Sequence, residues 1–315
     1  MEEGKGRVFV SGGTGYLGSW LIFKLLQHGY SVNTSIRSSP DSKKDVSYLT
    51  NLPGASQRLQ IFSADLAKPE SFNDAIEGCI GVFHVAHPID VLGKETEEEI
   101  TQKSIDGTIG ILQACLNAKT VKRFVYTSSV ATVMLDNRGL NIVDENILFG
   151  IYTITKTLAE KACLEFGEKH GLDIVTLIPP WISGPFICTN LPRSVRTILA
   201  LILGHEEEYQ NLSKASIVHI DDLAEAHIFL FENPHAKGRY ICSAVEITTE
   251  KLTEFLSARY PQYQIPSLNS LKDIHGMKSP SFSSKKLLDA GFKYKYSLEE
   301  IYDGAIKCCK EKGFL

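Results

Sequence analysis

The amino-acid sequence predicts an α/β fold, in which a doubly wound parallel sheet is followed by a smaller C-terminal lobe. Three observations lead to this prediction. Short β-branched apolar segments alternate with longer amphipathic segments in the first half of the chain, a glycine-rich turn joins the first pair, and the pattern becomes irregular after Ile178. Alternating strands and helices form parallel sheets that helices cover on both faces, and right-handed crossovers fix the winding.

The individual elements follow from hydrophobic periodicity. Short β-branched apolar runs predict strands, and apolar residues spaced three and four apart predict helices. Strands are expected at residues 7–10, 31–36, 59–62, 81–85, 123–127 and 173–178. Helices are expected at residues 16–28, 97–117 and 158–170, the last one preceded by an opening turn at Tyr152.

Composition restricts the class of protein. With 43% hydrophobic and 22% charged residues and a formal net charge of −4, the 315-residue chain is typical of a globular protein. Acidic and basic residues are mixed along the chain, which argues against nucleic acid as a partner, and no apolar run indicates a membrane segment. Seven cysteines without paired spacing predict reduced thiols. The first residues carry no leader signal, so we expect a cytoplasmic protein.

A dinucleotide site is indicated by the first strand–helix turn. Gly12, Gly15 and Gly18 form a G-x-x-G-x-x-G pattern between an apolar strand and the helix that begins at Tyr16. Glycines allow positive φ angles and a close approach of backbone N–H groups to a pyrophosphate, whose charge the helix N-terminus stabilises. The strand, turn and helix together predict a Rossmann-type site for a nicotinamide dinucleotide.

The end of the second strand indicates which dinucleotide is bound. NAD sites place an acid there for the ribose, and NADP sites place a basic residue near the 2′-phosphate. This strand ends at Arg37, the first acid comes only at Asp41, and Lys44 follows closely. We therefore expect NADP(H), with Arg37 on the phosphate and Lys44 in support.

Two further segments are expected near the cofactor. Asp65 follows the third strand, where its carboxylate can accept a hydrogen bond from the adenine amine or can cap a helix. The fourth strand ends in His84-Val85-Ala86-His87, whose small residues allow close backbone approach. No further ligands surround these histidines, so we expect no metal site.

These observations divide the chain into two parts. Residues 1–178 are expected to form the dinucleotide-binding domain, with contributions to its sheet from later segments. Residues 179–315 are expected to form mainly a substrate-binding lobe, which includes the pieces at 219–231, 239–242, 249–260 and 284–290.

Three residues have the chemistry of a carbonyl reductase. Tyr152 and Lys156 are four apart, which places them on one helical face. A phenol with a pKa of about 10 is a poor acid at neutral pH unless a nearby cation stabilises its phenolate, and Lys156 supplies that cation. Ser129, at the end of the fifth strand, can hold the carbonyl oxygen while Tyr152 delivers the proton. The alternative is that Tyr152 is an ordinary surface residue.

The chain resembles the extended short-chain dehydrogenases/reductases, and within them the plant dihydroflavonol reductase group with its vestitone reductase-like and alkaloid-pathway members. Matching segments cover nearly the whole length, at residues 12–20, 29–34, 45–55, 75–81, 120–129, 156–167, 218–222 and 308–315. The resemblance implies cofactor contacts from Gly12, Gly15, Tyr16, Leu17, Gly18, Arg37, Lys44, Asp65, Leu66, His84, Val85, Ala86, Tyr152, Lys156, Pro179, Ile182 and Ser194.

The same resemblance implies an activity. It implies reduction by NADPH of a ketone on a flavonoid-like, isoflavonoid-like or alkaloid metabolite, by a cytoplasmic monomer. Two features depart from the family pattern: Ser11 stands where threonine is usual, and the segment between Asp144 and Tyr152 is shorter than in vestitone reductases. Two alternatives stay open, an NADP-dependent alcohol or lactol dehydrogenase and a catalytically weak NADPH-binding protein.

Overall fold

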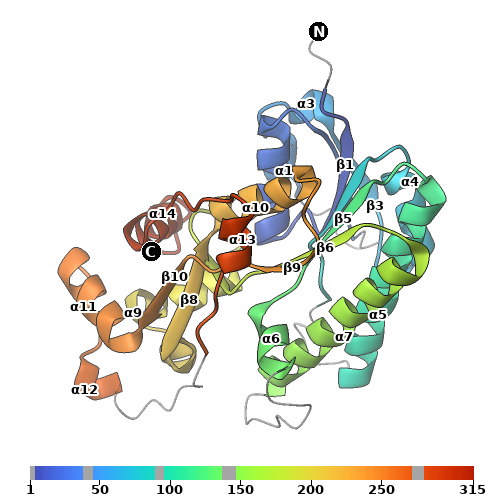
Figure 1. The fold of residues 1–315 in the computed structure, drawn as a ribbon. Helices are drawn as coiled ribbons and strands as arrows, with labels where there is room; N and C mark the ends of the chain where they lie inside the picture. The colour runs from blue at the N-terminus through green and yellow to red at the C-terminus, as the bar shows by residue number, and fades with distance from the viewer. Residues whose placement is uncertain (1–3, 38–44, 89–95, 137–146, 272–279) are drawn as a thin grey trace. The chain divides into compact units, whose positions relative to one another are not determined.

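The computed structural model describes residues 4–37, 45–88, 96–136, 147–271 and 280–315 (Figure 1). The chain divides into two compact units. The first comprises Met1–Ile178 with Ala224–Tyr240, and the second comprises Pro179–Leu223 with Ile241–Leu315.

The first unit is built on a seven-stranded sheet. Its strands are β1 (Arg7–Ser11), β2 (Ser31–Ile36), β3 (Leu59–Ser63), β4 (Gly81–His84), β5 (Arg123–Thr127), β6 (Ile174–Ile178) and β9 (Gly238–Ile241). The spatial order is β3-β2-β1-β4-β5-β6-β9, and the neighbouring pairs from β3 to β6 are parallel. The predicted doubly wound fold is confirmed. The strand order reverses between β1 and β4, where such sheets bind their ligands.

Helices cover both faces of this sheet. The longer ones are α1 (Tyr16–Gln27), α5 (Glu97–Ala118), α7 (Ile147–His170) and α10 (Ile220–Glu232), and the shorter ones are α2 (Ser47–Thr50), α3 (Ala55–Arg58), η1 (Pro69–Phe72), α4 (Asn73–Ile76) and α6 (Val130–Asp136). A capping box between Thr96 and Glu99 starts α5, because each residue's side chain accepts a backbone N–H of the other.

Helix α7 corrects one expectation. We expected the helix at residues 158–170 with its opening turn at Tyr152, but α7 begins at Ile147. Tyr152 therefore lies in the second turn and not at the helix start. Gly150 stands in the first turn, and the low helix propensity of glycine conceals the true beginning in the sequence.

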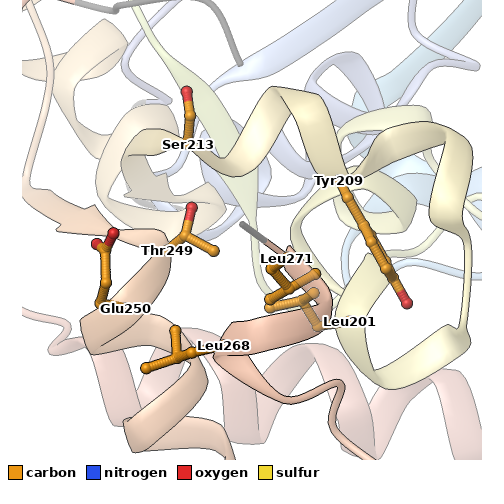
Figure 2. Close-up of a pocket in the computed structure, with 7 residues that line it drawn as sticks. All are labelled: Leu201, Tyr209, Ser213, Thr249, Glu250, Leu268 and Leu271. Atoms are coloured by element: carbon orange, nitrogen blue, oxygen red, sulfur yellow. The ribbon is translucent and has the colours of Figure 1, made fainter. Parts of the chain in front are cut away.

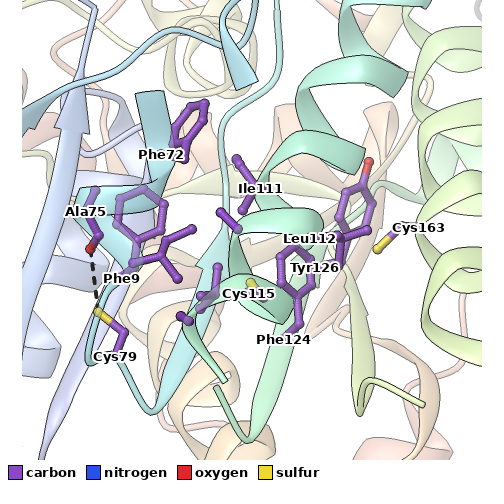
Figure 3. Packing of buried hydrophobic residues seen from close by; sticks show 14 of the residues in the cluster. Phe9, Phe72, Ala75, Cys79, Ile111, Leu112, Cys115, Phe124, Tyr126 and Cys163 are labelled. Carbon is purple, nitrogen blue, oxygen red and sulfur yellow. Dashed lines mark hydrogen bonds between the residues drawn. The ribbon is translucent and has the colours of Figure 1, made fainter. Parts of the chain in front are cut away.

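The strands alternate their side chains between two apolar cores. On one face Phe9, Phe124 and Tyr126 pack with residues of α5 and with Cys163 of α7 (Figure 3). On the other face Val8 and neighbouring strand residues pack with α1 and α10. All seven cysteines lie in the described residues; each is buried, and none forms a disulfide. Reduced thiols therefore fill apolar space here, as free cysteines commonly do.

The C-terminal segments 219–231 and 239–242 also correct an expectation. We expected them mainly in the smaller lobe, with later segments contributing to the large sheet; Ala224–Tyr240 belongs to the first unit, whereas residues 219–223 and 241–242 belong to the second. Ala224 and Ile228 of α10 are buried with Val8 and Phe83, and β9 joins the large sheet. The apolar side chains of α10 complete a core formed some two hundred residues earlier, which local sequence patterns do not reveal.

The second unit has its own small sheet. Strands β7 (Trp181–Ser183), β8 (Lys214–His219) and β10 (Val245–Thr248) lie in the order β10-β8-β7, with β7 parallel and β10 antiparallel to β8. Its helices are α8 (Arg193–Ile198), α9 (Ala200–Leu203), η2 (Glu206–Leu212), α11 (Thr249–Arg259), α12 (Leu268–Leu271), α13 (Lys285–Asp289) and α14 (Leu298–Glu311). Within the described residues, no helix of either unit is both long and apolar enough to cross a membrane.

Candidate active site

The glycine turn after β1 has the geometry that close packing of backbone requires. Gly12 has a φ of 69°, and a Cβ on it would lie 3.0 Å from the Cα of Ala86. A Cβ on Gly18 would lie 2.1 Å from the carbonyl oxygen of Gly12, so only glycine fits there. Gly15 is the N-cap of α1, whose first turn contains no acidic residue. No acid of the helix's own first turn therefore neutralises the positive end of its dipole.

The hydroxyl of Ser11 joins the ends of β1 and β4. Its oxygen accepts hydrogen bonds from the backbone N–H groups of Val85 and Ala86, both at 3.0 Å. It also lies 2.8 Å from Nδ1 of His84. Because the oxygen already accepts twice, its own hydrogen is donated to His84, which fixes Nε2 as the protonated nitrogen. Sequence reasoning noted that Ser11 keeps the family's hydroxyl and missed this structural use of it.

The residues expected at the adenosine end lie at the ends of β2 and β3. Arg37 and Asp65 form a loose ion pair, with 3.8 Å between Nε and Oδ1 and with side chains that are 60% and 36% exposed. Asp65 also accepts from the backbone N–H of Ala67 at 3.1 Å, so it caps a turn and not the N-terminus of a helix. Leu66 packs between the sheet and α5. Lys44 lies outside the described residues.

Lys156 is a buried cation at the carboxyl end of β5. Its ammonium donates to the carbonyl oxygen of Thr127 at 2.9 Å and lies 5.5 Å from the centre of the Tyr126 ring. Only 4% of the residue is exposed. Burial lowers the pKa of Lys156 to about 8, and the negative charge of Glu160 opposes that change. The helix therefore holds a cation, charged at neutral pH, one turn away from Tyr152.

Two neighbouring serines at the end of β5 have different surroundings. Ser128 is buried, and its hydroxyl donates to Oε2 of Glu160 at 2.8 Å. The hydroxyl oxygen of Ser129 accepts from the backbone N–H of Ala131 at 3.3 Å, and this residue is only partly buried. Ser129 is therefore the more accessible of the two, and its contact with a substrate stays a prediction.

Glu160 anchors this region, and sequence reasoning missed it. The carboxylate is 3% exposed and pairs with Arg239, with 2.9 Å between Nε and Oε1. Arg239 also donates to Thr132, which follows Ser129 closely. The i+4 spacing from Lys156 to Glu160 was a visible signal, but the partner on β9 lies 79 residues away.

Tyr152 lies against the end of β4. Its ring centre is 5.4 Å from that of His87, and the two rings are nearly perpendicular at 88°. The first-unit candidates thus lie at or after the carboxyl ends of β1 to β5 and in the first half of α7, with Arg37, Asp65 and Leu66 after β2 and β3. Among them, the side chain of Leu17 is buried in the fold, so we expect only its backbone to face a cofactor.

The remaining expected residues belong to the second unit. Pro179 precedes β7, Ile182 lies within β7, and Ser194 lies in the first turn of α8. This unit also contains a cavity of about 330 Å³, shown in Figure 2, whose mostly apolar lining includes none of the residues expected from the sequence. Its lining residues are Leu201, Tyr209, Ser213, Thr249, Glu250, Leu268 and Leu271.

Fold and site together define a dinucleotide-dependent oxidoreductase. A family model described as the NAD dependent epimerase/dehydratase family matches residues 8–242. The chain belongs to this family of extended short-chain dehydrogenases, and its cofactor class is NAD(P)(H). The predicted family, enzyme class and cofactor class are confirmed.

Individual relatives narrow the type of enzyme. Vestitone reductase from Medicago sativa is 51% identical over 327 aligned residues, which cover 100% of both proteins. Noscapine synthase SDR1 from Papaver somniferum is 46% identical, covering 99% of this chain and 95% of that protein. Dihydroflavonol 4-reductase from Zea mays is 45% identical, covering 100% and 93%.

A solved structure agrees with these relatives. The crystal structure of vestitone reductase from alfalfa matches with a TM-score of 0.87 at 49% identity, covering 99% of this chain and 100% of that one. The chain is a reductase of the vestitone and dihydroflavonol reductase type.

Proposed function

We propose that this chain uses NADPH to reduce a ketone on a flavonoid-like, isoflavonoid-like or alkaloid metabolite. One observation carries the proposal: the ammonium of Lys156 is held at the Thr127 carbonyl, one helical turn from Tyr152. A buried cation at that place favours the phenolate that proton transfer from Tyr152 produces. The names of the relatives, vestitone reductase and dihydroflavonol 4-reductase, support this substrate class.

The chemical step divides among three side chains. Ser129 donates its hydroxyl hydrogen to the carbonyl oxygen, which gains negative charge during reduction. Tyr152 transfers its phenolic proton to that oxygen, and Lys156 stabilises the phenolate that remains. Bound NADPH supplies the hydride.

Preference for NADPH over NADH is assigned to Arg37. This guanidinium follows β2, and the described part of the strand end offers no acid to bind a ribose in its place. The ion pair with its partner Asp65 is long and lies at the surface, so it contributes little free energy. Replacing the carboxylate of Asp65 by a 2′-phosphate as the partner of Arg37 therefore costs little. Charge-assisted bonds of this kind contribute about 1.5 to 3 kcal/mol each. Lys44, which we expect to assist, follows in the sequence.

Substrate choice is assigned to the second unit and to the segment before Tyr152. The alignment with vestitone reductase runs over 327 positions, more than the 315 residues of this chain, so the chain lacks residues that this relative has. We place the deficit between Asp144 and Tyr152 and expect a substrate range different from that of vestitone reductase. Residues 144–146 of that segment lie outside the described residues, and α7 begins at Ile147. We also propose that the protein is a cytoplasmic monomer. Light scattering after size-exclusion chromatography tests the oligomeric state.

The deciding experiment follows a label. The protein is incubated with NADPH deuterated at the transferable position and with a panel of dihydroflavonols, isoflavanones and alkaloid ketones, and products are analysed by mass spectrometry. We expect deuterium on a new carbinol carbon, and we expect Tyr152→Phe to lower kcat by about 10² to 10⁴-fold with NADPH affinity little changed. Matching incubations with NADP⁺ and the corresponding alcohols or lactols test the oxidative alternative. Full activity of Tyr152→Phe, or cofactor binding without turnover of any panel member, would contradict the proposal.

A further inference from the structure

His87 occupies the point where β4 meets the candidate catalytic helix. It lies three residues after the end of β4, and its ring is perpendicular to that of Tyr152 at a centre-to-centre distance of 5.4 Å. The sequence shows it only as a histidine between an alanine and a proline. In the structure it contacts the side chain to which we assign proton transfer.

The hydrogen bonds of His87 have a defined direction. The hydroxyl of Thr155 donates to the backbone carbonyl of Tyr152 at 3.0 Å, so toward Nε2 of His87, at 3.3 Å, its oxygen can only accept. Nε2 of His87 therefore carries the hydrogen. In a neutral ring Nδ1 is then an acceptor, and its partner is the hydroxyl of Ser104 on α5 at 3.3 Å. His87 thus bridges α5 to the turn of α7 that contains Tyr152.

The bridge continues to the cofactor turn. The backbone carbonyl of Ser104 accepts from Thr108 at 2.8 Å, and the Thr108 oxygen lies 3.2 Å from Nε2 of His84. Nδ1 of His84 accepts in turn from Ser11 at the end of β1. A chain of short polar side chains therefore runs from β1 through α5 to α7. The two halves meet at Ser104, whose backbone carbonyl accepts from Thr108 and whose hydroxyl donates to His87, so each half has its own fixed direction.

The electrostatic surroundings keep His87 in the form that this chain needs. Burial, and then the positive charge of Lys156 and the neighbouring His84, lower the pKa of His87 well below its ordinary value. A neutral imidazole has one donor and one acceptor nitrogen, as the two hydrogen bonds require. A protonated ring would offer two donors and would lose the bond from Ser104.

We propose that His87 is a positioning residue for Tyr152, which holds the tyrosine ring by its edge-to-face contact and the second turn of α7 by its hydrogen bond to Thr155. This inference rests on the proposed function, because it takes Tyr152 as the proton donor. His87 itself exchanges no proton with the substrate in this scheme. Its two nitrogens are occupied by Thr155 and Ser104, and its effect passes through the orientation of the phenol.

The test uses two variants that remove the same hydrogen bond from opposite sides. His87→Phe keeps an aromatic ring against Tyr152 and removes both nitrogens, and Thr155→Val removes the acceptor hydroxyl. The matched control is Thr157→Val, because Thr157 makes the same kind of bond to the helix backbone, 2.8 Å to Thr153, and is not a partner of His87 in the described contacts. The double variant, which carries His87→Phe and Thr155→Val together, completes a double-mutant cycle.

Single-turnover rates, KM, NADPH dissociation constants and melting temperatures are measured for all of them. We expect both single variants to lose about tenfold in the rate of the chemical step, since small errors in orientation are costly there. KM and the NADPH dissociation constant should stay within about twofold of the wild-type values, and the double variant should be no slower than the slower single variant. Thr157→Val should keep the wild-type rate. This division between rate and binding is not expected from a general loss of structure.

Other results overturn the inference. A wild-type rate in His87→Phe, or losses that multiply in the double variant, would show that the hydrogen bond does not position the phenol. If His87→Phe does not fold, Thr155→Val against Thr157→Val decides alone, and equal rates for the two refute the inference. Tyr152→Phe in the same assay distinguishes a failure of the proposed function from a failure of the role proposed for His87. An active Tyr152→Phe contradicts the proposed function. An inactive Tyr152→Phe together with an unaffected His87→Phe contradicts only the role of His87.

Discussion

Lys156 should support proton transfer from Tyr152 and, because its ammonium is buried, should lower the free energy of unfolding of the protein. Burial lowers the pKa of its ammonium from 10.5 to about 8. A lowering of this size corresponds to about 3 kcal/mol that folding loses at pH 7 by removing the cation from water. Lys156→Met removes this loss and leaves the Thr127 carbonyl without its donor, which costs about 1 kcal/mol. We therefore expect the cofactor-free variant to be more stable than the wild type by about 2 kcal/mol.

The pH dependence of this difference has a definite sign. Above the ordinary pKa of 10.5 the lysine is neutral in the folded and the unfolded chain, so burial of the charge costs nothing. As the pH falls from there toward 8, the unfolded chain binds the proton first, and the folded state loses relative stability. Below pH 8 the loss is complete and constant. The advantage of Lys156→Met should therefore be present at pH 7 and should close between pH 8 and 10.5.

Denaturant unfolding of the cofactor-free proteins at pH 7 and at pH 10 measures both effects. The control is Lys161→Met on the same helix, whose side chain is 70% exposed and whose change should stay within about 0.5 kcal/mol. Lys156→Met should also have a lower kcat and, because the family resemblance implies a cofactor contact from Lys156, weaker NADPH binding. A variant less stable than the wild type at pH 7, or an advantage that does not change with pH, would refute the electrostatic reasoning.

Three further substitutions test other parts of the site. Arg37→Ala should weaken NADPH binding about tenfold to a hundredfold and leave NADH binding nearly unchanged, as isothermal titration can show; equal NADPH affinity would contradict the assignment. Ser129→Ala should lower kcat through loss of one hydrogen bond to the developing oxyanion, and a stopped-flow rate equal to that of the wild type would remove Ser129 from the mechanism. Ser11→Ala leaves the N–H groups of Val85 and Ala86 without their acceptor and should destabilise the protein by about 1 to 3 kcal/mol in thermal unfolding, whereas Ser11→Thr keeps the hydroxyl and serves as its control.

The sequence predicts the sheet of the first unit well because its signals are local. Each strand from β1 to β6 is a short apolar run, and each crossover helix has its own amphipathic period, so neighbouring residues suffice to recognise them. The glycine turn is equally local, since a Cβ on Gly18 would meet the carbonyl oxygen of Gly12 six residues earlier. The catalytic candidates Tyr152 and Lys156 are found for the same reason, because four residues separate them on one helix.

Features that depend on distant partners escape a local interpretation. Residues of α10 are assigned wrongly to the smaller lobe because Ala224 and Ile228 find their apolar partners on β1 and β4. In the sequence Glu160 is indistinguishable from an acid on an exposed helix surface. In the structure it pairs with Arg239 of β9. In both cases the sequence shows the type of side chain, and only the fold shows the distant residues that it packs against or pairs with.

The hydroxyl of Ser11 is a third example of a group whose partners lie far away in the sequence. In the sequence, serine in place of threonine is a small change that keeps an oxygen. In the structure that oxygen holds two backbone N–H groups of the β4 end and sets the tautomer of His84. The tautomer of His84 makes its Nε2–H the donor to Thr108, whose hydroxyl donates to the carbonyl of Ser104, whereas the direction of the His87 bond is set separately by the bond from Thr155 to the Tyr152 carbonyl. Ser11 at the cofactor turn therefore fixes the direction of the hydrogen bonds as far as Ser104, whose backbone carbonyl accepts and whose hydroxyl donates independently of each other.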